Sequence, residues 1–139
     1  MIIDSIRNYM LSCPLLEGEK INVNCLGQKA VTYTIDSVAE NPLIKRYCDG
    51  GTLKQYKFII ALRDVYDEII SENIRIANFF EQLAAWIENQ NAAGILPKID
   101  DERCIAEKIE VTKNAYLLES SIDSMRYQME LRLVYRQER

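Results

Sequence analysis

Two periodic stretches near the middle of the chain define its expected core. From Thr52 to Leu62, apolar side chains recur at every second position, which is the pattern of a strand with one buried face. The residues of that face are Tyr56, Phe58, Ile60 and Leu62. From about Asp67 to Asn91, apolar residues recur at steps of three and four, and this spacing predicts a long amphipathic helix. A strand followed by a helix that covers it is therefore the predicted centre of the fold.

Both ends of this helix carry recognisable signals. Asp67 or Ser71 is expected to accept a hydrogen bond from the first free backbone amides. Gly94 suits the left-handed residue that closes a helix, and Pro97 prevents its continuation. A helix of this length spans about 35 Å, which is enough to cover a sheet.

Shorter elements are expected in the N-terminal half. The spacing of apolar residues predicts a helix from Ile2 to Cys13, which stops before Pro14. Apolar and polar residues then alternate in Ile21–Cys25 and in Val31–Ile35, which we interpret as two short antiparallel strands. The stretch from Asp36 to Gly51 has no clear period, and either a helical turn or a packed loop fits it.

Two strands are predicted at the C-terminal end, joined by a turn from Glu119 to Ser124. In the first, Ile105, Ile109 and Val111 share one face, and the strand continues to Leu118. The last strand has the most regular alternation in the sequence, with an apolar face of Met125, Tyr127, Met129, Leu131, Leu133 and Tyr135. Its other face carries Arg126, Gln128, Glu130, Arg132 and Arg136.

The order of these elements predicts an α+β fold. We expect a mostly antiparallel sheet of about five strands, with the long central helix and the short N-terminal helix packed on its apolar face. The chain has no repeat or linker, so residues 1–139 are expected to form a single domain. The pattern leaves open whether solvent or another subunit covers the polar face of the sheet.

The composition narrows the classes of function. The chain contains no histidine, which excludes histidine-dependent catalysis and histidine metal sites. Its 4 cysteines include no close pair, so we interpret them as small buried residues of a reducing, intracellular compartment rather than as a zinc site. The net charge of -4 disfavours binding of nucleic acid or anionic lipid through the whole surface, although a local basic patch stays compatible with it. No apolar run approaches the length of a membrane span. We therefore predict no metal, no cofactor and no membrane partner.

Several local patterns resemble binding motifs, and each has a simpler structural explanation. Gly50-Gly51 lacks the further glycines and the lysine of a phosphate-binding loop, so a plain turn is favoured. The acidic run Asp100-Asp101-Glu102 is typical of a solvated turn rather than of a metal site. Basic and aromatic residues interleave from Lys54 to Tyr66 as in base-stacking sheets, but the alternation places the two kinds on opposite faces. Trp86 lies at the edge of the helix stripe, where core packing is favoured over a partner contact.

For the charged row of the last strand, unlike these motifs, a structural and a binding role both remain open. Arg126, Glu130, Arg132 and Arg136 are long side chains of mixed sign on one face. Such a row protects a sheet from aggregation, or it recognises a neighbouring subunit. The sequence leaves both interpretations open.

The order of several short motifs resembles that of a known family. The motifs are Tyr9–Leu16, Val31–Ser37, Gly50-Gly51 with Gln55 and Phe58, Arg63 with Tyr66, Phe79–Glu88, Ile109–Val111, Tyr116-Leu117, Arg126–Gln128 and Leu133–Tyr135. In this order they are similar to small phage and prophage proteins of Gram-positive bacteria known as minor capsid or tail terminator proteins. The resemblance covers nearly the whole chain, with one departure at Asn114-Ala115, where the family pattern has a glycine. Some members are named chloramphenicol resistance proteins, which disagrees with the absence here of a histidine to deprotonate a hydroxyl.

The resemblance implies a virion structural protein and not an enzyme. Such proteins form a ring, usually a hexamer, on the head-proximal end of the tail tube, where the ring ends tube growth and offers a docking surface to the neck. The implied partners are other copies of the chain, the tail tube protein, and sheath and neck proteins, with DNA only as passing cargo. In a headless, phage-tail-like bacteriocin the ring would cap the particle. The implied location is the bacterial cytoplasm during assembly and then the tail or tail-like particle.

We predict that the interface with a neighbouring subunit or with the tube includes Arg63, Tyr66, Asp67, Arg126, Glu130 and Arg132. Two exposed loops, Asp36–Asp49 and Pro97–Arg103, are expected to be available for further contacts. One alternative function is another neck component, such as a head-completion or stopper protein, and a more remote one is a small enzyme of unknown chemistry. A terminator binds the end of a tube, a stopper binds the portal side, and an enzyme has a concave pocket with perturbed titratable groups.

Overall fold

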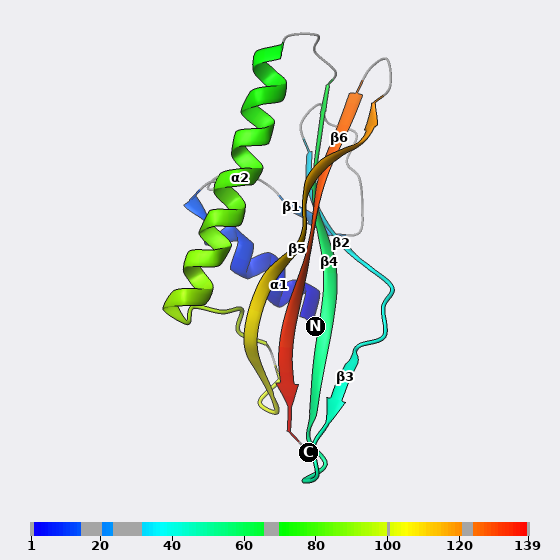
Figure 1. Ribbon diagram of the computed structural model, residues 1–139, viewed down its shortest axis with the longest axis vertical. Coiled ribbons are helices and arrows are strands. Elements are labelled where there is room, and N and C mark those ends of the chain that lie inside the picture. The colour runs from blue at the N-terminus through cyan, green and yellow to red at the C-terminus, as the bar shows by residue number, and fades with distance from the viewer. Residues whose placement is uncertain are drawn as a thin grey trace.

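A computed structural model describes residues 2–14, 21–23, 32–65, 70–99, 101–120 and 124–138 of the chain. Its elements are α1 (Ile2–Leu11), β1 (Ile21–Val23), β2 (Thr32–Ser37), β3 (Leu43–Arg46), β4 (Thr52–Val65), α2 (Ile70–Ala93), β5 (Cys104–Ser120) and β6 (Ser124–Gln137). The architecture is α+β, with a mostly antiparallel sheet, a short N-terminal helix and a long second helix, as the sequence predicts (Figure 1).

The described strands form one sheet in the order β1-β2-β4-β6-β5. β6 pairs antiparallel with the whole length of β4. On the other edge of β4, β2 pairs with residues 58–63 and β3 with residues 52–54, so β2 and β3 lie end to end along that edge. The sheet is therefore five strands wide at its broadest, although β3 also contributes to it.

β3 corrects the expectation of a helical turn or a packed loop between Asp36 and Gly51. Because β2 ends at Ser37, the first residues of β4 have a free edge, and Leu43–Arg46 pairs with it. Three of the four residues of β3 are exposed, so the strand shows no apolar alternation in the sequence. A tight turn closes the β3–β4 hairpin, in which the Tyr47 amide donates to the Gly51 carbonyl at 2.8 Å. The prediction of a plain turn at Gly50-Gly51 is thus confirmed, and Gly50 adopts a φ of 92°.

β1 and β2 run parallel, which corrects the predicted antiparallel pair. Residues Ile21–Val23 pair in the same direction with Tyr33–Ile35. Alternating apolar residues assign side chains to a face of a sheet but carry no information on strand direction, and the turn signal at Gly27 suggested a hairpin. Cys25 and Val31, at the ends of the predicted strands, lie outside the described residues.

The C-terminal end of α2 agrees with the prediction. Gly94 has a φ of 75°. Its amide donates to the Asn91 carbonyl at 3.1 Å, and the Ile95 amide donates to the Gln90 carbonyl at 2.9 Å. These two bonds form the double hydrogen-bond pattern that closes helices at a left-handed glycine.

The beginning of α2 differs in part from the prediction. The helix begins at Ile70, so Ser71 lies inside it and cannot be the residue that precedes the first turn. Asp67, the other predicted capping residue, lies outside the described residues. No helix in the described part of the chain combines the length and the apolar character needed to cross a bilayer.

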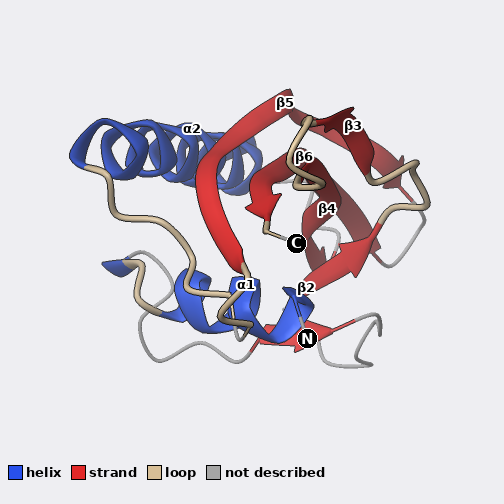
Figure 2. Cartoon of the chain, turned by 90° about the horizontal axis from the view of Figure 1, so that it is seen from below, coloured by secondary structure: helices blue, strands red, loops and turns tan. Residues whose placement is uncertain are grey.

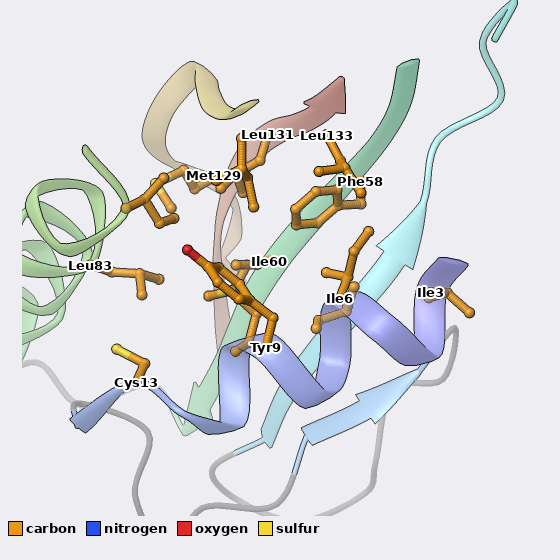
Figure 3. Close-up of a cluster of buried hydrophobic side chains, with 14 of the residues drawn as sticks. Ile3, Ile6, Tyr9, Cys13, Phe58, Ile60, Leu83, Met129, Leu131 and Leu133 are labelled. Atoms are coloured by element: carbon orange, nitrogen blue, oxygen red, sulfur yellow. The ribbon is translucent and has the colours of Figure 1, made fainter. Parts of the chain in front are cut away.

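The core lies between the apolar face of the sheet and the two helices (Figure 2). Figure 3 shows side chains from α1, α2, β4 and β6 meeting there. Fully or nearly fully buried members are Ile6, Met10, Ile35, Phe58, Ile60, Phe80, Leu83, Ile87, Ile109, Met129, Leu131 and Leu133. Each large apolar side chain buried in this way stabilises the fold by about 1.5–3 kcal/mol. The predicted core faces of β4 and β6 are confirmed for these residues.

Tyr9 and Trp86 connect the two helices at the edge of the core. Their ring centroids lie 5.3 Å apart with the planes tilted by 47°. The Tyr9 hydroxyl donates to the Ile95 carbonyl at 2.9 Å, directly after the end of α2. Trp86 therefore packs against the core, as expected from its position on the helix.

A β-bulge near the start of β5 corrects the predicted position of Ile105. Ala106 pairs with Tyr135 and Lys108 with Val134, so one residue of β5 has no partner on β6. The extra residue reverses the alternation. Ile109 is consequently 0% exposed, whereas Ile105 is 45% exposed and lies on the opposite face from the predicted one.

α2 also covers part of the open edge of β5. The Asn91 side-chain oxygen accepts a hydrogen bond from the Ile109 amide at 2.9 Å. The Asn91 side-chain nitrogen donates to the Ile109 carbonyl. One amide side chain thus replaces a neighbouring strand at this position and fixes the helix to the sheet.

Candidate interaction surfaces

The structure places three of the six predicted interface residues on the polar face of β6. Arg126, Glu130 and Arg132 occupy alternate positions on the face opposite the buried Met129 and Leu131. The backbone of Arg63 pairs with Arg126 across β4 and β6. The side chain of Arg63, together with Tyr66 and Asp67, lies outside the described part of the chain.

Arg126 is paired inside its own subunit. Its guanidinium lies 3.0 Å from the Asp36 carboxylate, and these two side chains are only 15% and 25% exposed. Arg126 Nε also donates to the Gln128 side-chain oxygen at 3.2 Å, and the Gln128 amide donates to the Tyr116 hydroxyl at 2.6 Å. Lys113 completes the row, with its Nζ 4.8 Å from the centre of the Tyr116 ring. This row joins β2, β6 and β5.

Arg132 has its own intramolecular partners. It forms an ion pair with Glu110 on β5 and donates to the Gln55 side-chain oxygen on β4 at 3.2 Å. The Gln55 amide in turn donates to the Asn41 carbonyl at 3.1 Å, and Lys108 lies 3.8 Å from Glu110. This second row connects the segment before β3 to the far edge of the sheet.

These contacts give the arginines of the charged row a role within the subunit. The guanidinium groups of Arg126 and Arg132 are each neutralised by a carboxylate on a different strand, so these two pairs hold the strands in register. Glu130 is half-buried and forms no ion pair with a described residue. The predicted pairing of these arginines with another subunit or with the tube stays a prediction.

The polar face is also less open than its sequence suggests. Thr34, Ala61, Gln128 and Val134 occupy outward positions on β2, β4 and β6, yet each is at most 5% exposed. The long charged side chains beside them lie partly across the sheet, with exposed fractions of 15% for Arg126 and 31% for Arg132. Much of this face is therefore covered by its own subunit.

The Asp36–Arg126 pair should contribute measurably to the stability of the isolated chain. Replacing either residue by alanine leaves a partly buried charge without its partner, so each single variant is expected to lose about 1–2 kcal/mol of unfolding free energy. The double variant should lose less than the sum of the two, with a coupling of about 1 kcal/mol. Urea denaturation of the four proteins measures this coupling, and Glu130→Ala is the matched control on the same face. A coupling near zero would show that the pair does not stabilise the subunit.

A partly apolar groove lies between α2 and the sheet. Its volume is about 370 Å³. Its floor is formed by the buried Phe80 and Met129, and its walls include the small side chains Ala84 and Ala115. Two exposed carboxylates of α2 lie on its rim, Glu81 and Glu88. We call this site the acidic groove and define it by Phe80, Glu81, Ala84, Glu88, Ala115 and Met129.

Irregular pairing of β5 with β6 shapes this groove. Val111 pairs with Leu131 and Tyr116 with Gln128, so two more residues of β5 than of β6 are used between these pairs. The additional residues bend the strand at the position of Ala115. A small side chain at the bend and alanines on α2 leave space above Phe80 and Met129 that larger residues would fill.

A basic edge lies on β3. Ile44 is 43% exposed, and the next two residues, Lys45 and Arg46, are exposed as well. Lys45 Nζ lies 5.5 Å from the centre of the Tyr47 ring, an exposed contact that leaves the ammonium accessible. Among the large apolar side chains that are exposed in the described ranges, Ile44 alone is followed directly by two cations. We call Ile44, Lys45 and Arg46 the basic edge.

The acidic run after Pro97 forms a turn. The Asp101 carboxylate accepts a hydrogen bond from the Arg103 amide at 2.9 Å, and this bond is the main reason why the pKa of Asp101 is lowered. The Cys104 amide donates to the Asp101 carbonyl at 3.0 Å. Asp100 lies outside the described residues, and no group of potential metal ligands occurs within the described ones.

A second hollow of about 680 Å³ adjoins this turn and is lined in part by Asp101 and Cys104. Burial raises the pKa of the Cys104 thiol, and the Asp101 carboxylate adds to the effect. The nucleophilic thiolate is therefore less populated at neutral pH than in a free cysteine. The arrangement favours a structural thiol over a catalytic one.

The acidic groove was not predicted from the sequence, and the basic edge was predicted only as part of the exposed Asp36–Asp49 loop. The sequence signal for the groove is the set of alanines on the central helix, Ala77, Ala84 and Ala85. This signal is not specific, because alanine is common in helices of any environment. The basic edge falls in the stretch interpreted as a turn or loop. Comparison of the chain with protein-family models and with curated protein sequences finds no match.

Proposed function

We propose that this chain is a structural protein of a phage or of a phage-tail-like particle, and that it caps the head-proximal end of the tail tube as a ring. The observation that carries the proposal is the ordered set of motifs, which extends from Tyr9 to Tyr135 and resembles that of tail terminator proteins. The ring would stop tube polymerisation and present a docking surface to the neck. Its partners would be other copies of the chain and the tube protein.

The fold is compatible with this role. Both helices pack on one face of the sheet, and α2 and β3 lie at different sides of the molecule (Figures 1 and 2). Rings are built from contacts between two different surfaces of identical subunits, which close after a fixed number of copies. A net charge of -4 would also suit a channel through which DNA passes without adhering.

Native mass spectrometry at two protein concentrations, with negative-stain imaging, tests the ring. We expect a closed ring, a hexamer by the resemblance, whose population rises with concentration. If the isolated chain is monomeric, it should still bind one end of tubes polymerised from the tail tube protein of the same particle and limit their length. Binding to the portal side without binding to tubes would favour the stopper alternative. The proposal would be contradicted if the chain formed no ring and bound neither the tube nor the portal side.

A further inference from the structure

We propose that neighbouring subunits bind each other by placing the basic edge of one copy in the acidic groove of the next. This inference rests on the proposed ring and identifies the contact that builds it. The occupant of the groove is therefore a second copy of the same chain. Two features support the assignment, complementary chemistry and the relative positions of the two surfaces.

The acidic groove offers an apolar floor between two negative charges. Glu81 and Glu88 are seven residues apart on α2, so they lie on the same side of the helix, about 10 Å from each other. Both are exposed, and neither forms an ion pair with a described residue. Phe80 and Met129 form the floor between them, and the alanine walls leave room for an apolar side chain.

The basic edge has the matching composition. Ile44 provides an exposed apolar side chain of a size that a groove of about 370 Å³ accommodates. Lys45 and Arg46 are exposed, flexible cations next to Ile44, and as consecutive residues of β3 they extend to opposite faces of the strand. Burying Ile44 between two ion pairs would remove apolar surface from water and would fix the orientation of the contact.

The two surfaces lie on opposite sides of the subunit. α2 and β3 are separated by the width of the sheet in both Figure 1 and Figure 2. A surface on one side that binds a different surface on the other side of the next copy gives a head-to-tail contact, which is the kind that generates rings. A symmetric dimer would instead require one surface to bind itself.

An alternative to the groove contact is pairing of the open edge of β5 with a strand of the next copy, which would extend the sheet between subunits. Four irregularities interrupt the pairing of β5 along its length, and Asn91 occupies its open edge at Ile109. Bulges and covered edges are features that prevent strand-to-strand pairing between molecules. These features disfavour sheet extension through β5, whereas the groove beside it stays open to a partner.

Charge reversal on each surface tests the contact. One variant carries Glu81→Lys and Glu88→Lys, and the other carries Lys45→Glu and Arg46→Glu. All four positions are exposed, so both variants should fold, which circular dichroism and urea denaturation will verify. A control with Glu107→Lys and Glu138→Lys raises the net charge as much as the first variant does, at exposed positions outside the groove and outside the two predicted contact loops.

Each reversed variant alone brings like charges together and is expected to weaken the subunit contact by about tenfold or more, as seen by native mass spectrometry. The control should assemble as the wild type does. An equimolar mixture of the two reversed variants should assemble again, with the two chains alternating, because every contact then joins opposite charges. The wild-type assembly should also weaken as salt is raised.

The outcomes separate this inference from the proposed function. If the wild type forms a ring only on tubes, the same variants and the same mixture are compared on tube ends. Rings or caps formed equally well by either reversed variant would overturn the groove contact while leaving the proposed function intact, and so would a mixture that fails to recover. A wild-type chain that neither closes into a ring nor binds tubes would overturn both.

Discussion

Replacement of Ile109 by alanine is expected to lower the free energy of unfolding by about 2–5 kcal/mol. The side chain is 0% exposed and belongs to the core cluster formed by the sheet and both helices. Its removal deletes apolar contacts and leaves a cavity, because Asn91 fixes the backbone of the same residue to α2 and limits relaxation. Urea denaturation followed by circular dichroism measures the loss.

Ile105 is the matched control for this prediction. It is the same residue type on the same strand, four positions away, but it is 45% exposed beyond the β-bulge. Ile105→Ala should therefore change the unfolding free energy by less than about 1 kcal/mol. A regular strand would place both isoleucines on one face and make the two costs equal. Equal losses of unfolding free energy in Ile109→Ala and Ile105→Ala would therefore contradict the bulge.

The long strands and the long helix could be predicted because their apolar faces are complete. Along β6, Met129, Leu131 and Leu133 are all buried at alternate positions, and a shift by one residue would expose every one of them. The stripe of Phe80, Leu83 and Ile87 on α2 is equally unambiguous. Where one face of a helix or strand is fully buried, the spacing of apolar residues in the sequence therefore predicts that face.

The sequence does not record features that depend on pairing between strands. β3 is mostly exposed and forms because a free edge of β4 is available, and the direction of β1 is set by its contact with β2. The bulge before Ile109 changes the face of Ile105 without changing the spacing of apolar residues. In each case the determining interaction joins segments that are distant in the sequence.

For the candidate site too, the face of a single strand could be predicted, whereas contacts between distant segments could not. The alternation of β6 placed Arg126, Glu130 and Arg132 on one face, and the structure has them there. The partners of the two arginines, Asp36 and Glu110, are distant in sequence, so only the strand order of the sheet brings them together. The surface with the clearest composition in the sequence thus turned out to be largely paired within the subunit. The acidic groove could not be predicted because it is formed only where α2 packs beside the sheet.

A high pH is expected to destabilise the protein through Tyr9. Its side chain is 8% exposed, and burial raises its pKa from 10.0 to about 12. The folded state therefore holds the phenol proton more tightly than the unfolded state. The resulting stability is fully present below pH 10 and is lost as the pH rises towards 12, because only the unfolded chain ionises in this range. At about 1.4 kcal/mol for each pH unit, the total loss amounts to about 2–3 kcal/mol.

Tyr9→Phe isolates this contribution. Burial also raises the pKa of Tyr135, so the wild type and the variant share that part of the alkaline loss, and only their difference reports Tyr9. At pH 8 the variant should be less stable by about 1 kcal/mol, because the Ile95 carbonyl loses the hydroxyl that donates to it while the ring can still pack on Trp86. Between pH 10 and pH 12 the wild type should lose more stability than the variant, so that the two unfolding free energies, measured in urea, converge and then cross. Parallel pH curves would show that Tyr9 ionises equally in both states, and the link between α1 and the end of α2 would then be open to solvent.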